Sequence, residues 1–132
     1  MKYELFIGRW QPPHSGHRWL WEQKLEEGKN VLVAIRDIPP DEAQPFTAEQ
    51  VKDMIETIYE DNDRVKVIII PDIASINYGR GVGYAIVEHK PNENIARISA
   101  TDIRNAIRSG DDKWKELVDE KIQSQVEEVL KT

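Results

Sequence analysis

The chain has 132 residues, a formal net charge of −6 and no cysteine. This length fits one domain with a hydrophobic core, and the acidic balance argues against a general nucleic-acid binder, whose surface would be basic. No apolar run approaches the roughly 18 residues that a membrane span requires, and no targeting signal precedes the first apolar run. We therefore expect a cytoplasmic protein without disulfides that uses neither nucleic acid nor membrane as its partner.

The first part of the chain predicts the order strand, loop, helix, strand. Residues 2–7 are a short apolar run, typical of a buried strand in a parallel sheet. Residues 8–17 contain the breakers of a loop, residues 18–27 predict a helix, and residues 30–36 predict the second strand. Such a βαβ unit has a right-handed crossover. Three side chains of its helix are expected to face the core: Trp19, Leu20 and Leu25.

The middle of the chain predicts a second unit of the same kind. Residues 37–45 are rich in proline and form a loop. Thr47 and Gln50 have the spacing of a capping box, which begins a helix that extends to about residue 60. Residues 65–70 predict the third strand. Four apolar side chains of the helix recur at helical spacing: Val51, Met54, Ile55 and Ile58.

Residues 72–83 lose any regular pattern and contain three glycines. One interpretation is a surface loop without a role in binding. The other is a substrate-facing loop, in which Arg80 donates to an anion and a tyrosine such as Tyr78 stacks on the substrate. Residues 84–89 then predict a short strand.

The last third predicts helices. Ser99 or Thr101 can cap a helix that continues to about residue 109, with Arg104 in its first turn. The helix dipole disfavours a cation at this end, so Arg104 indicates either a bound anion or a solvated helix face. Residues 111–132 predict one or two helices that pack on the same domain. Their expected packing positions are Trp114, Leu117, Val118, Ile122, Val126, Val129 and Leu130.

Two histidines lie where the first loop meets its helix. His14 is expected in the loop and His17 in the first helical turn, with Gly16 between them allowing a phosphate close to the backbone. Free N–H groups of the helix start, together with Arg9 and the imidazoles, can bind an anion. Two histidines at this spacing also occur by chance on surfaces and in cores. Zinc needs three or four ligands, and only His89 remains, so we expect no metal site.

The alternation of strands and helices predicts an α/β fold. We expect a single domain over residues 1–132 with a Rossmann-like, doubly wound parallel sheet in three layers, α/β/α. Ligands of such sheets bind beyond the carboxyl ends of the strands. Both helix starts can therefore converge on one polyphosphate. No serine triad, cysteine nucleophile or carboxylate pair stands out, which favours phosphoryl or nucleotidyl transfer by positioning and charge stabilisation.

Two runs of the chain, GRWQPPHSGH at 8–17 and ISATDIR at 98–104, resemble the nucleotidyltransferase superfamily with the H-x-G-H signature. Its members include nicotinamide mononucleotide adenylyltransferases and small cytidylyltransferases. The resemblance implies transfer of a nucleoside monophosphate from ATP or CTP to a phosphate-bearing small molecule, with release of pyrophosphate. It also implies Mg²⁺ held mainly by the substrate phosphates, and a homo-oligomer.

The resemblance assigns roles by position. His14 and His17 match the signature histidines, which hold the triphosphate and stabilise charge on the α-phosphate. Ser99, Thr101 and Arg104 match residues that bind the β- and γ-phosphates. Five further residues are expected to line or contact the nucleotide: Phe6, Ile7, Gly8, Arg9 and Gly16.

One position departs from the family pattern. Val51 stands where both subfamilies usually carry an arginine. Either Arg36 or Arg80 takes over that role, or the acceptor differs from theirs. The resemblance leaves two other classes open: a nucleotide-binding regulator without turnover, and a fragment related to class I aminoacyl-tRNA synthetases, for which the chain is short and acidic.

Overall fold

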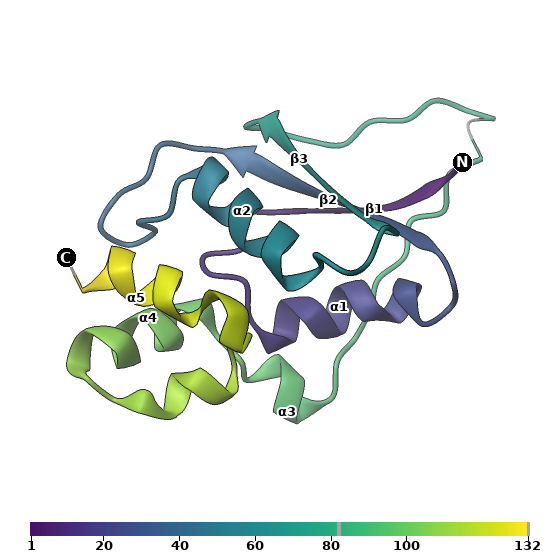
Figure 1. Cartoon of the computed structure of the whole chain (residues 1–132). Coiled ribbons are helices and arrows are strands. Elements are labelled where there is room, and N and C mark those ends of the chain that lie inside the picture. The colour runs from purple at the N-terminus through teal and green to yellow at the C-terminus, as the bar shows by residue number, and fades with distance from the viewer. Residues whose placement is uncertain (82, 132) are drawn as a thin grey trace.

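Three parallel strands form the sheet of the computed structural model: β1 (Tyr3–Gly8), β2 (Asn30–Asp37) and β3 (Val65–Pro71). They are hydrogen-bonded in the order β1-β2-β3 (Figure 1). Parallel neighbours need crossover connections, which are provided by α1 (Ser15–Leu25) and α2 (Ala48–Ile58). The predicted Rossmann-like α/β fold with a parallel sheet is confirmed.

The two crossover helices lie on the same face of the sheet. Both connections step across the sheet in the same direction, so right-handed crossovers place α1 and α2 on one side. In Figure 1, α1, α4 and α5 lie below the strands and α2 overlaps them, while the chain that follows β3 first runs above the strands and then descends to α3. Among the described residues, the helices thus form a layer on this face of the sheet.

The side chains of the strands show the same asymmetry. Val31, Val33 and Ile35 of the central strand point toward the helices and are at most 1% exposed. On the edge strand, Tyr3 and Leu5 point to the opposite face and are 38% and 54% exposed. A parallel sheet usually buries both faces. Here one face carries the core and the other is largely open.

The rest of the chain is helical: α3 (Glu93–Ala96), α4 (Ala100–Ser109), the 3₁₀ helices η1 (Asp112–Glu116) and η2 (Glu120–Ile122), and α5 (Gln123–Leu130). We call residues 111–131 the C-terminal segment. It packs against α4 and against α2. Its buried side chains are Trp114, Val118, Ile122, Val126 and Leu130.

At several places the structure has the helix boundary that the local sequence predicts. Thr47 and Gln50 make the reciprocal capping box that begins α2. Ser99 caps α4 by accepting from the Asp102 N–H. Gly110 ends that helix in the left-handed conformation with a φ of 84°.

Two local predictions were wrong. Residues 84–89 form no strand, and Tyr84 and Ile86 are more than 70% exposed. Without a buried face, nothing fixes a pairing register for this segment. On α1 the fully buried aromatic side chain is Trp21, not Trp19, because Trp21 packs between other aromatic rings.

The structure describes residues 1–81 and 83–131. Val82, in the predicted loop 72–83, and Thr132, in the predicted C-terminal helices, lie outside the described residues. Within those ranges, none of the helices has the length and apolar character needed to cross a bilayer.

Candidate active site

The two motif histidines begin α1 together. His14 is the N-cap, and its Nδ1 accepts from the N–H of Gly16 at 3.0 Å and of His17 at 3.4 Å. In return, the His14 N–H donates to Nδ1 of His17 at 3.3 Å. This is a capping box in which imidazoles replace the usual hydroxyl and carboxylate. The local sequence thereby fixes both rings relative to the helix start.

The hydrogen bonds also fix where each ring carries its proton. Each Nδ1 accepts from a backbone N–H and is therefore unprotonated, so a neutral imidazole must carry its hydrogen on Nε2. The rings of His14 and His17 stack, with centroids 3.6 Å apart and planes 18° from parallel. Two Nε2–H donors side by side suit two oxygens of one phosphoryl group.

Burial keeps both rings uncharged. It lowers the pKa of His14 to about 4. Burial and the neighbouring His14 lower the pKa of His17 to about 2. The Trp10 indole stands edge-on to His17 at a centroid distance of 4.9 Å and forms an apolar wall. At neutral pH the histidines therefore act as neutral hydrogen-bond donors, and positive charge must come from arginines.

The backbone N–H groups of the helix start are not free, contrary to the sequence-based expectation. The Ser15 N–H donates to the Leu117 carbonyl at 2.7 Å, and the next two donate to His14. The Arg18 N–H makes the first intrahelical bond, to the His14 carbonyl at 3.0 Å. Anion binding here therefore depends on side chains.

Two glycines make room for the aromatic rings. A Cβ at Gly16 would lie 2.9 Å from Cε1 of His14, and a Cβ at Gly8 would lie 2.9 Å from the Trp10 ring. The same Cβ at Gly16 would be 3.5 Å from Cβ of Ile98. The space above Gly16 thus holds the imidazole, and the second motif, which begins at Ile98, lies directly beside the first.

Arg104 ties the second motif to the loop that carries the first. Its Nη1 donates to the carbonyl of Gln11 at 2.6 Å, and its Nη2 donates to Oγ1 of Thr101 at 3.2 Å. The Ser99 hydroxyl is occupied as the α4 cap, bonded to the Asp102 N–H. The structure thus brings Thr101 and Arg104 to the histidine loop, while Ser99 orders the helix start.

Buried polar groups concentrate at this place. Gln11, His14 and Arg104 are 6%, 5% and 7% exposed, and Gln11 exchanges two hydrogen bonds with the backbone of Phe46. Arg9 Nη2 is buried and has no hydrogen-bond partner among the described residues. A buried guanidinium donor without an acceptor indicates a ligand that supplies one. Phosphate oxygens are suitable acceptors.

The structure does not bring the other candidate residues to the histidines. Tyr78 and Arg80 are exposed, and within the described part of the chain neither bonds to either motif. Arg36 is engaged by Asp72, whose Oδ1 accepts from Nε and Nη2 at 3.0 and 2.9 Å. Val51 is fully buried in the core and offers no polar group.

Phe6, Ile7 and Gly8 end β1 next to this loop. The Phe6 ring stacks on His89 with centroids 6.1 Å apart. Ile7 pairs with Ala34 in the ladder. These residues lead the chain to the site, at the carboxyl end of the edge strand.

Three contributors to the site were missed. Trp10 adopts a left-handed φ of 56° and donates from Nε1 to the Ala34 carbonyl. Gln11 buries its amide, and Leu117 accepts the first N–H of α1. A glycine two residues before an aromatic residue was a usable signal for Trp10. Nothing in the local sequence distinguishes Leu117, because its role is played by a backbone carbonyl.

The site has no cage for a metal ion. No group of three or more His, Asp or Glu side chains within the described ranges is placed to bind one ion. The described side chains that the two motifs bring together include the neutral imidazoles and the guanidinium of Arg104. They are suited to phosphate oxygens.

Comparisons with known proteins agree with this geometry. The cytidylyltransferase-like family model matches residues 5–75, which include most of β1, all of β2 and β3, and the histidine pair. A nicotinamide-nucleotide adenylyltransferase of Pyrobaculum neutrophilum is 30% identical over 149 aligned residues, covering 89% of this chain and 83% of the relative. A nicotinamide-nucleotide adenylyltransferase of Caldivirga maquilingensis is 27% identical over 155 aligned residues, covering 95% of this chain and 87% of the relative.

A third relative matches a shorter part of the chain. A nicotinamide/nicotinic acid mononucleotide adenylyltransferase of Acinetobacter baylyi is 32% identical over 75 residues, covering 54% of this chain and 40% of the relative. The two longer alignments exceed the 132 residues of the chain, so those relatives contain segments without a counterpart here. The matched residues include the histidine pair and the strands that position it. The chain belongs to the cytidylyltransferase-like family, and it is a nucleotidyltransferase of the adenylyl- or cytidylyltransferase type.

Proposed function

We propose that the protein transfers the adenylyl group of ATP to the phosphate of a small mononucleotide acceptor and releases pyrophosphate. The observation that carries this proposal is the stacked, neutral pair His14 and His17, each with its hydrogen on Nε2, in a helix start whose Gly16 lies beside Ile98 of the second motif. The names of the relatives support ATP as donor and a nicotinamide mononucleotide as the first acceptor to test.

The residues of the chain suit an in-line displacement. An oxygen of the acceptor phosphate attacks the α-phosphorus, the bond from that phosphorus to the bridging oxygen breaks, and its electron pair leaves on pyrophosphate. In this proposal the Nε2–H groups of His14 and His17 donate to the α-phosphate oxygens, where negative charge increases. Arg9, with its unpartnered Nη2, and Arg104 hold the β- and γ-phosphates.

Magnesium enters this proposal bound to the triphosphate. The described residues offer no cage for it, and Mg²⁺ in nucleotide sites is commonly held by substrate phosphates. The ion neutralises charge on the phosphates, whereas the protein orients them through the histidines and arginines.

The test is release of pyrophosphate in the presence of Mg²⁺. Purified protein is given ATP, CTP, GTP or UTP with nicotinamide mononucleotide, nicotinic acid mononucleotide or glycerol 3-phosphate, and the His17→Ala variant is the control. We expect release with ATP and a mononucleotide only. Release with CTP and glycerol phosphate would instead assign a cytidylyltransferase. Nucleotide binding without release from any pair would favour a regulator that lacks turnover.

The Arg104→Ala variant is expected to bind ATP about 10- to 100-fold more weakly, because charge-assisted hydrogen bonds are worth about 1.5–3 kcal/mol. Isothermal titration calorimetry measures the affinity. Arg108→Ala is the matched control, since Arg108 lies on the same helix and donates to the Glu42 carbonyl. Equal affinities of the Arg104 variant and the native protein would place the triphosphate elsewhere.

The Arg80→Ala variant is expected to raise the KM of the acceptor about 3- to 10-fold and to leave the KM of ATP within about twofold, since one exposed ion pair contributes about 1 kcal/mol. Arg80 is exposed on the chain between β3 and α3. Arg97→Ala, which removes another exposed arginine, is the control. If both KM values stay at the native level, the loop has no role in binding the acceptor.

A further inference from the structure

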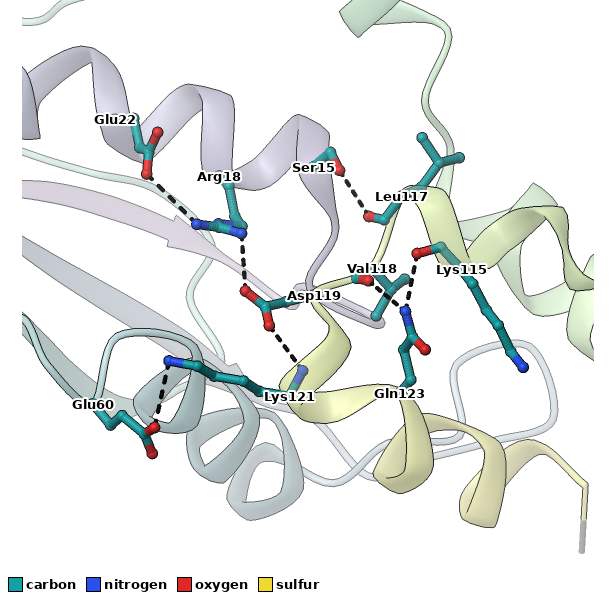
Figure 2. Close-up of polar contacts among 10 residues, drawn as sticks. All are labelled: Ser15, Arg18, Glu22, Glu60, Lys115, Leu117, Val118, Asp119, Lys121 and Gln123. Carbon is teal, nitrogen blue, oxygen red and sulfur yellow. Dashed lines mark hydrogen bonds and ion pairs between the residues drawn. The ribbon is translucent and has the colours of Figure 1, made fainter.

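The first residue of α1 is held by the C-terminal segment. The N–H and Oγ of Ser15 both donate to the carbonyl of Leu117, at 2.7 and 3.0 Å (Figure 2). Ser15 lies between the N-cap residue His14 and Gly16, whose N–H donates to the His14 ring. The contact therefore acts on the turn that fixes both imidazoles.

An ion pair one helical turn later also joins α1 to the C-terminal segment. Arg18 Nη1 donates to Oδ2 of Asp119 at 2.9 Å, and the Asp119 side chain is only 16% exposed (Figure 2). The other carboxylate oxygen accepts from the Lys121 N–H at 2.9 Å and caps η2. One carboxylate thus links the first turns of α1 and η2.

Hydrogen bonds and buried side chains stabilise the turn that contains Leu117. The side-chain amide of Gln123 donates to the carbonyls of Lys115 and Val118, at 3.0 and 3.1 Å. Trp114 and Ile122, on either side of the turn, are 3% and 0% exposed. Because these contacts hold the turn in place, the Leu117 carbonyl has a defined position from which it holds Ser15.

We propose that the C-terminal segment positions His14 and His17 for catalysis by holding the first turn of α1. This role rests on the proposed function. The histidines are bonded to the backbone of that turn and to each other, so a shift of Ser15 moves both Nε2–H donors together. Displacements of about 1 Å at a catalytic group can cost roughly 100-fold in rate. Ser15, Leu117 and Asp119 are positioning residues in this scheme, because they act through the histidines.

The decisive variant is Ser15→Pro. Proline is favoured at the first position of a helix, and the extended φ and ψ of His14, −142° and 179°, are those that a residue before proline adopts. The substitution therefore keeps the helix start but removes both donors to Leu117. We expect kcat to fall about 10- to 100-fold, while the KM of ATP stays within about threefold.

A second variant, Asp119→Asn, keeps an oxygen that can cap η2 but loses the ion pair with Arg18. We expect it to lower kcat about 3- to 10-fold. Two matched controls remove a carboxylate partner without changing either contact at the α1 start. Glu60→Gln removes the partner of Lys121 in the turn after α2, and Glu22→Gln removes the weaker partner of Arg18. Both controls are expected to keep the native kcat.

A readout without substrate separates this inference from the proposed function. The pKa and tautomer of each histidine are measured by NMR of the ¹⁵N-labelled side chains. In Ser15→Pro and Asp119→Asn, but not in the controls, we expect the pKa values of His14 and His17 to rise toward the ordinary 6.5. If the native protein releases no pyrophosphate, the proposed function fails, and the NMR result alone decides the positioning role.

Unchanged histidine pKa values and an unchanged kcat in Ser15→Pro would overturn the inference, as would an equal loss of kcat in Glu60→Gln. If Ser15→Pro does not fold, Asp119→Asn decides by the same two measurements.

Discussion

Replacing His17 by alanine is expected to lower kcat about 10²- to 10³-fold, which is the usual effect of removing one preorganised donor from a developing negative charge. The variant loses the Nε2–H donor and also the Nδ1 atom that accepts from the His14 N–H at 3.3 Å. The His17 ring contacts the core only at its edge, through Trp10 and Trp21, so the fold should remain, with about 1 kcal/mol lost from the helix start. Steady-state release of pyrophosphate measures the effect.

Two variants make the interpretation specific. His17→Asn supplies an oxygen that can accept from the His14 N–H, so it should recover most of the stability without recovering the rate. His89→Ala removes the third histidine of the chain, which stacks on Phe6 outside both motifs, and should leave kcat unchanged. A His17→Ala enzyme with nearly native turnover would remove the histidine pair from the mechanism.

The second large effect is expected on stability as the pH is lowered. In the folded protein, burial lowers the pKa of His14 to about 4 and that of His17 to about 2, whereas in the unfolded chain both take up a proton near 6.5. Below this value the unfolded state binds more protons, so the free energy of unfolding rises with pH in that window. The contribution is fully present above pH 6.5 and is lost as the pH falls toward 4.

Each histidine contributes a slope of about 1.4 kcal/mol per pH unit, and the pair should reduce the free energy of unfolding by about 5 kcal/mol between pH 7 and pH 4.5. This is comparable to the total stability of many domains. Urea unfolding at several pH values measures it. The double variant His14→Asn/His17→Asn shares every carboxylate with the native protein and should lose most of the slope. Equal slopes in the two proteins would contradict the buried, neutral state of the histidines.

Much of the fold follows from signals within a few residues of each other. The capping box of Thr47 and Gln50, the cap at Ser99 and the end of α4 at about residue 109 each formed where the sequence predicts them. The three apolar runs became the three parallel strands. The placement of His14 before the helix and His17 in its first turn is also confirmed. Such signals act locally, so a single sequence contains them.

The parts that the sequence did not predict depend on distant contacts. The lowered pKa values of the histidines depend on burial, to which distant parts of the chain contribute. Arg104 reaches the Gln11 carbonyl across 93 positions of the chain. The spacing of H-x-G-H suggests that Gly16 admits a phosphate, but the nearest atoms to its missing Cβ are those of the His14 ring. Packing of this kind has no periodic pattern along the chain.

The absence of a strand at residues 84–89 has the same origin. The number of strands and their order cannot be derived from apolar runs alone, because a run such as 84–89 becomes a strand only if it finds a paired neighbour and a buried face. In this chain it finds neither among the described residues. The edge strand β1 therefore keeps an open side.

The bond between Ser15 and Leu117 joins residues 102 positions apart and has a consequence for biosynthesis. The ribosome completes all three strands and α1 long before it adds Leu117. In a nascent chain that ends within the α4 region, the first turn of the histidine helix still lacks its anchor. Catalytic competence is therefore expected to appear late in synthesis, which limits turnover of nucleotide by incomplete chains.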